Sequence, residues 1–185
     1  MKSLLFLMLI IPTMFVYAQK GAPDIVNYAA KKNIGKVKSC VKKGHDINAK
    51  SRMQWSALSY SVKNNDINMA KYLLDNGAKV DITINTKESP LSLAAKYNYT
   101  QMAQLLISYN ADVNFSDLMQ FSIMHWAAKN NNKNLVDLLL SKEANINAKN
   151  VSGRTALDVA NASIKSYLVD KGAKTGKQLY DEKHK

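Results

Sequence analysis

The chain has 185 residues, of which 46% are hydrophobic and 22% are charged; these proportions are typical of a globular domain and exclude a fibrous or largely disordered chain. A net charge of +12 favours acidic partners, a class that includes acidic proteins, anionic membranes and nucleic acids. Cys40 is the single cysteine of the sequence, which excludes an internal disulfide.

Residues 1–18 have the composition of a secretory signal peptide. Lys2 precedes an apolar run of about 14 residues, and Val16 and Ala18 place small residues at positions −3 and −1 of a cleavage site. The alternative is a membrane anchor, but the run is shorter than the roughly 20 residues that span a bilayer, and Pro12 interrupts it. We therefore predict cleavage after Ala18, export to the periplasm or the extracellular space, and no membrane span in the mature protein.

A period of 33 residues organises the rest of the chain. Repetition at this length indicates a stack of small units that bury each other's apolar faces. The apolar positions that keep the period are Leu58, Leu91, Met124 and Leu157, and then Leu73, Leu106 and Leu139, with Cys40 one period earlier. The positions that close the units are Gly44, Gly77, Asn110 and Glu143.

Each unit has the pattern of two short helices. In the third unit, the apolar segment 91–95 predicts a tight first helix, and Met102 and Leu106 mark the buried stripe of a second helix. Asn110 follows this helix, where the backbone takes a left-handed conformation that Gly and Asn adopt most easily. Glu143 takes the same position in the next unit, at a cost of about 1 kcal/mol.

The period divides the chain into five units followed by a tail. We place the units at about 19–50, 51–83, 84–116, 117–149 and 150–176, within a repeat domain that covers 19–176. The first unit lacks the usual start, and the last is shortened, so we expect a short second helix around 163–170. Residues 177–185 are polar and are expected to form a loose tail.

The repeating pattern resembles the ankyrin repeat. The stretches that carry this resemblance are Ser89-Pro90-Leu91-Ser92, Ile123-Met124-His125-Trp126-Ala127-Ala128, Asn76-Gly77-Ala78-Lys79-Val80-Asp81, Ala111-Asp112-Val113-Asn114 and Gly153-Arg154-Thr155-Ala156-Leu157. The resemblance implies an all-α solenoid of about five helix-turn-helix units, joined by β-turn or hairpin loops. It also implies a protein-binding scaffold that uses its turn tips and the exposed side of its first helices.

Carried over to this sequence, that surface gives a set of candidate partner-binding residues. They are Arg52, Met53, Trp55, Lys63, Lys96, Tyr97, Leu118, Met119, Phe121, Lys129 and Arg154. The three lysines recur with the period and predict a basic row along one face, whereas the apolar members suit a protein interface. The alternative is structural: some apolar side chains would tuck between adjacent turns, and the lysines would only be solvated.

No arrangement of residues in the sequence predicts a catalytic, metal or cofactor site. His125 stands where the ankyrin pattern has a histidine that braces turns through hydrogen bonds, and this role is expected here. The two other histidines do not have the spacing of metal ligands. Cys40 replaces a recurring leucine, so a buried core thiol is favoured over a reactive one.

The leading hypothesis is therefore an exported, monomeric scaffold that holds an acidic partner protein on its concave face. Two versions are equally compatible, an inhibitor or immunity-like protein and a helper of an envelope enzyme. The alternative is polyanion binding, to anionic lipid or nucleic acid, which predicts affinity that falls steeply with salt. Export argues against nucleic acid, and an enzyme would need a site between repeats that the sequence does not indicate.

Overall fold

The computed structural model describes residues 23–185, and the predicted signal peptide at 1–18 lies outside them. Within the described residues there are eleven helices and no regular strand. The helices are α3 (Asp24–Ala30), α4 (Ile34–Lys42), α5 (Ala57–Lys63), α6 (Ile67–Asp75), α7 (Pro90–Lys96), α8 (Thr100–Ser108), α9 (Ile123–Lys129), α10 (Lys133–Leu140), α11 (Ala156–Val159), α12 (Ala162–Asp170) and α13 (Gly176–Lys183).

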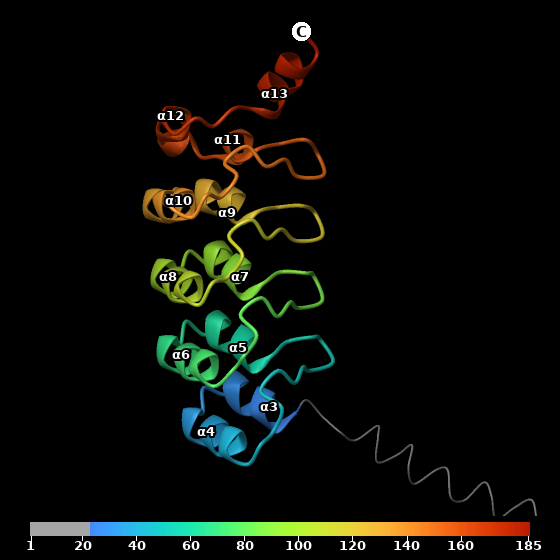
Figure 1. Cartoon of the computed structure of the whole chain (residues 1–185), viewed down its shortest axis with the longest axis vertical. Helices are drawn as coiled ribbons and strands as arrows, with labels where there is room; N and C mark the ends of the chain where they lie inside the picture. Colours follow the sequence, from blue (N-terminus) through green and yellow to red (C-terminus); the bar gives the residue numbers. More distant parts are fainter. Residues whose placement is uncertain (1–22) are drawn as a thin grey trace, which may run out of the picture.

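The first ten of these helices form five antiparallel pairs stacked along one axis (Figure 1). The first helices of the pairs form an inner row, and the second helices form an outer row beside it. Loops that join one pair to the next project from the inner row, on the side away from the outer helices. The chain is thus an all-α solenoid, as the sequence predicts.

Capping residues explain where the helices begin and end. The hydroxyl oxygens of Ser56, Ser89 and Ser122 accept hydrogen bonds from backbone N–H groups in the first turns of α5, α7 and α9. Asn110 and Glu143 follow α8 and α10 with φ angles of 61° and 60°, which confirms the predicted left-handed positions. The starts of α5, α7 and α9 and the ends of α8 and α10 are therefore specified by local sequence.

Apolar side chains at the 33-residue spacing form the core between the two rows. The fully buried ones include Leu58, Leu91, Met124, Leu73, Leu106 and Leu139. Cys40, which replaces the leucine of the first outer helix, is 5% exposed, as predicted. Burial, aided by the charge of Asp24, raises the pKa of this thiol, so it serves as a small apolar group.

A second set of contacts between units is polar. Asn48, Asp81 and Asn114 each accept, through a side-chain oxygen, a backbone N–H of the following unit, at 2.8, 3.2 and 2.8 Å. Asn147 does the same with the N–H of Lys174, at 2.7 Å. These four residues, the interunit ladder, keep the 33-residue spacing and fix one unit against the next.

Replacing Asp81 with Asn is expected to raise the free energy of unfolding by about 0.5 kcal/mol at pH 7. The pKa of the Asp81 carboxyl is raised, first by burial and also by the charge of Asp112. The native state is thus favoured while this carboxyl is protonated, and that stability is lost as the pH rises through the raised pKa. Chemical denaturation at pH 7 and well below 3.8 checks this, because the gain should vanish in acid.

The reciprocal variant is the control for this prediction. Asn114→Asp places a second carboxylate in the ladder, next to a backbone N–H that Asn114 already satisfies. It should lower stability at pH 7 and leave it unchanged in acid. Equal stability of both variants and the wild type at pH 7 would show that the ladder is insensitive to charge.

Two expectations for the C-terminal end are wrong. The second helix of the last unit, α12, has nine residues and is not short; α11, with four residues, is the shortened helix. The tail is helical rather than loose, because Thr175 and Gln178 form a capping box at the start of α13. No residue of α13 is buried, so the polar character of this segment is as predicted.

Polar contacts hold α13 against the last unit. The Asp158 carboxylate accepts the backbone N–H of Gly176 at 2.7 Å, and the Thr155 hydroxyl donates to the Lys174 carbonyl at 2.7 Å. A Cβ at Gly176 would lie 2.0 Å from the carbonyl oxygen of Gly153, so only glycine allows this approach. None of the helices between residues 23 and 185 has the length and hydrophobicity needed to cross a bilayer.

Candidate functional site

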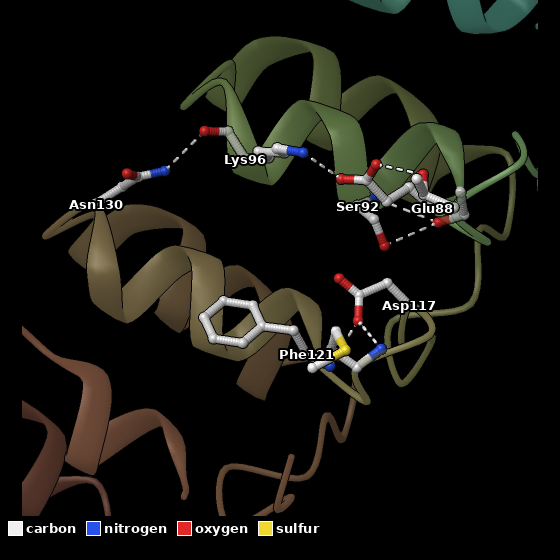
Figure 2. A network of polar contacts seen from close by, with 9 residues as sticks. Glu88, Ser92, Lys96, Asp117, Phe121 and Asn130 are labelled. Carbon is white, nitrogen blue, oxygen red and sulfur yellow. Dashed lines mark hydrogen bonds and ion pairs between the residues drawn. The ribbon is translucent and has the colours of Figure 1, made fainter. Parts of the chain in front are cut away.

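Four short loops project from the inner row of helices, at 51–55, 84–88, 117–121 and 150–154 (Figure 1). Each is closed by a hydrogen bond from the N–H of its first residue to the carbonyl of its last, at 2.8, 3.1, 3.4 and 2.9 Å. Side chains reinforce them: Asp117 accepts the N–H groups of Met119 and Phe121, at 2.8 and 2.9 Å (Figure 2). The loops are therefore ordered by their own hydrogen bonds.

The last three loops are also joined to one another. The Leu118 N–H donates to the Thr86 carbonyl at 3.4 Å, and the Val151 N–H donates to the Met119 carbonyl at 3.1 Å. Loops 84–88, 117–121 and 150–154 thus form a continuous edge, which presents its side chains at fixed spacing.

Exposed apolar side chains stand at the tips of these loops. Leu118 and Met119 are 56% and 60% exposed, Met53 is 61% exposed, and Val151 on the next loop is 53% exposed. Arg52 and Arg154 are exposed beside them. The candidate residues Met53, Leu118 and Met119 therefore lie on an accessible surface, and Val151 extends it by one loop.

Trp55 and Phe121 are only half-buried, because each ring packs on its own unit. The Trp55 ring lies 5.0 Å from that of Tyr60, and the Phe121 ring lies 4.7 Å from that of His125 and 4.6 Å from that of Trp126. Both rings support the base of their own loops, and each leaves part of its surface exposed.

The predicted lysine row is present, but its members lie over aromatic rings. The Lys63 ammonium is 5.2 Å from the centre of the Trp55 ring, and that of Lys129 is 5.1 Å from the centre of the Trp126 ring. Lys96 is 5.5 Å from the same Trp126 ring. The row is therefore a set of cation–π contacts rather than three freely solvated charges.

Lys96 is also neutralised by a carboxylate. Its ammonium lies 2.7 Å from Glu88, whose second oxygen accepts the Thr86 hydroxyl at 2.6 Å (Figure 2). Glu88 is 5% exposed, although the sequence places it at a turn tip. The sequence signal for this pair is an acid at the position where Trp55 and Phe121 stand in the neighbouring units.

The asparagines beside the lysines support the stack rather than forming an open surface. The Asn64 amide donates to the Ala29 carbonyl at 3.2 Å, and the Asn130 amide donates to the Ala95 carbonyl at 2.8 Å. Asn130 also donates to the Lys96 carbonyl at 3.2 Å (Figure 2). Both asparagines thereby satisfy the end of the inner helix in the preceding unit. Tyr97 takes this position in the third unit, lies 37% exposed and packs 5.7 Å from Tyr99.

His125 has the bracing role that the sequence predicts. The imidazole is fully buried: its Nδ1 accepts the Ser122 N–H at 3.1 Å, and its Nε2 donates to the Arg154 carbonyl at 2.9 Å. Burial lowers the pKa of this histidine, which keeps it neutral. In the part of the chain that the structure describes, no three His, Cys, Asp or Glu side chains gather where they could hold a metal ion.

Comparison with known proteins agrees with this architecture. A family model described as ankyrin repeats (3 copies) matches residues 26–117 and 117–178. No curated protein matches the chain.

Proposed function

Since the chain belongs to the ankyrin-repeat family, we propose that it is an exported scaffold that holds a partner protein on its loop tips and inner helices. Ankyrin repeats are protein–protein interaction scaffolds, typically without enzymatic activity. The proposed scaffold acts as a monomer and binds one acidic partner. It serves either as an inhibitor or immunity-like protein or as a helper of an envelope enzyme.

The observation that carries this proposal is the apolar tip surface, which consists of Met53, Leu118, Met119 and Val151. Each is more than half exposed, at a place where solvent alone would favour polar residues. Hydrogen bonds within and between the loops order the backbone, so little conformational entropy is lost on binding. A preorganised apolar surface of this kind suits a folded protein.

The charge of the chain supports an acidic partner. Lys63 and Lys129 have no carboxylate partner within residues 23–185. They are the last residues of the inner helices α5 and α9. Such cations steer an acidic protein toward the surface and suppress the approach of a basic one. The pairing of Lys96 with the buried Glu88, in the centre of the row, makes the surface less favourable for a uniform polyanion.

Capture of the partner from an envelope extract tests the proposal. The double variant Leu118→Ser, Met119→Ser is expected to lose at least about tenfold in affinity, because two large apolar contacts are removed. The matched control is Val169→Ser, which removes a similarly exposed apolar side chain, 54% exposed, from outer helix α12.

The intact mass of the protein recovered from the same envelope extract shows whether the signal peptide is cleaved after Ala18.

Two outcomes contradict the proposal. If the tip variant and the Val169 variant retain the same partners equally, the loop tips are not the contact surface. If binding is lost in moderate salt regardless of the tip residues and any anionic polymer displaces the partner, the chain is a polyanion binder.

A further inference from the structure

Trp126 lies between lysines of two units on the inner row. It stands on α9 at the position where α5 and α7 carry Tyr60 and Leu93. The ammonium groups of Lys129, from the same helix, and of Lys96, from the preceding unit, lie 5.1 and 5.5 Å from the centre of its ring. The site thus combines groups from the third and fourth units.

The indole N–H of Trp126 is buried and has no hydrogen-bond partner in the described part of the chain. A buried donor without an acceptor is unfavourable, and native proteins contain few of them. The neighbouring polar groups bond elsewhere: the Glu88 oxygens accept from Thr86 and Lys96, and the Asn130 amide nitrogen donates to the Ala95 carbonyl. None of them accepts the indole N–H, which is left without a partner in the described residues.

The cluster also has unbalanced charge. Glu88 offsets one of the two lysines, and Lys129 has no acidic partner in the described residues. The unmet requirements at this place are thus one negative charge and one hydrogen-bond acceptor. A carboxylate supplies both in a single group.

We propose that Trp126, Lys96 and Lys129 form a receptor for an Asp or Glu side chain of the partner protein. One carboxylate oxygen accepts the Trp126 indole N–H, and the other accepts the Lys129 ammonium, with Lys96 contributing its remaining donors. Since the indole N–H is buried in the free protein, the side chains that cover it move aside as the carboxylate enters. This inference rests on the proposed scaffold function and assigns the acidic partner residue to one place.

The two tryptophans of the chain allow a direct test, because Trp55→Phe leaves Trp126 as the only indole fluorophore. The probe is a tetraglutamate peptide, acetylated and amidated at its ends and titrated at low ionic strength, with the equally capped tetraglutamine peptide as its uncharged match. The glutamate peptide should produce a saturable change in Trp126 fluorescence, and the glutamine peptide should produce none.

Variants identify the groups responsible. Lys129→Met, in the Trp55→Phe background, should weaken binding by about tenfold, since a hydrogen bond to a charged group is lost. Lys133→Met is the matched control, because Lys133 lies over Tyr167 on the outer side and should leave binding unchanged. Trp126→Phe, with binding followed by calorimetry, keeps an aromatic ring but removes the N–H and should also weaken binding.

Each alternative result overturns the inference. Equal binding of the glutamate and glutamine peptides, or equal effects of the Lys129 and Lys133 variants, excludes a specific carboxylate receptor. Binding of a single-stranded oligonucleotide with the same dependence on Lys129 indicates a polyanion surface instead. If the glutamate peptide does not bind but the tip variants still fail to capture the partner protein, the carboxylate receptor is excluded and the scaffold function is retained. The two failures are therefore distinguishable.

Discussion

Replacing Leu106 with Ala is expected to lower the free energy of unfolding by about 2–5 kcal/mol. Leu106 is fully buried on α8, in the central unit, where it lies between the helix pairs on either side. Units of a repeat stack are stabilised mainly by their neighbours, so a cavity here weakens two interfaces. Urea denaturation followed by circular dichroism measures the loss, which is large relative to the stability of most domains.

Two further variants test the explanation. Leu105→Ala removes the same side chain from a partly exposed position and should cost less than half as much. Leu168→Ala creates a buried cavity in the last unit, where it should fray the C-terminal end and leave most of the helical signal. If all three variants lose equal stability in one cooperative step, the stack does not behave as a row of coupled units.

Replacing His125 with Ala is expected to lower the free energy of unfolding by about 2–3 kcal/mol. The substitution leaves the Arg154 carbonyl and the Ser122 N–H without their imidazole partner, and it opens a cavity beneath the Phe121 ring. Because Arg154 belongs to the following loop, the bond that joins α9 to that loop is lost. Thermal or chemical denaturation at pH 7.5 measures the effect.

Serine is the informative control at this position, because Ser59 and Ser92 occupy it in the second and third units. Each bonds through its hydroxyl group to the N-cap serine of its own helix. His125→Ser should therefore recover part of the stability. Burial lowers the pKa of His125, so its stabilisation is present above the ordinary value of 6.5 and is lost as the pH falls through the lowered pKa. Between pH 7.5 and mildly acidic pH, the stability of the His125→Ser variant should change less than that of the wild type.

Much of the fold follows from local features of the sequence. The period, the buried leucine positions and the left-handed ends at Asn110 and Glu143 depend only on residues within one unit. The errors at the C-terminal end have a different origin. Spacing within the last unit indicates a missing turn but not which helix loses it. The polar composition of the tail predicts a loose segment, but the Thr175–Gln178 capping box starts α13, and Asp158 of the last unit accepts the Gly176 N–H.

The candidate site was harder to predict, because its character depends on contacts between units. The 33-residue spacing correctly places Lys63, Lys96 and Lys129 in a row, yet the ring beneath Lys96 belongs to the following unit. Glu88 has the sequence position of a loop residue, but it is buried and bonds to Lys96 and Thr86 of its own unit. The contact of Lys96 with Trp126 depends on how two units stack, and that of Lys96 with Glu88 depends on how one unit folds; a one-dimensional pattern contains neither.

Site-specific photocrosslinking tests the central claim, that a partner protein binds at the loop tips. A photoreactive amino acid is placed at Met119 on the tip surface or, as the control, at Val169 on outer helix α12, two positions of similar exposure. In cells that naturally produce the protein, we expect a discrete crosslinked partner from position 119 and none from position 169. Crosslinks of equal yield at both positions, or at position 169 alone, would contradict it.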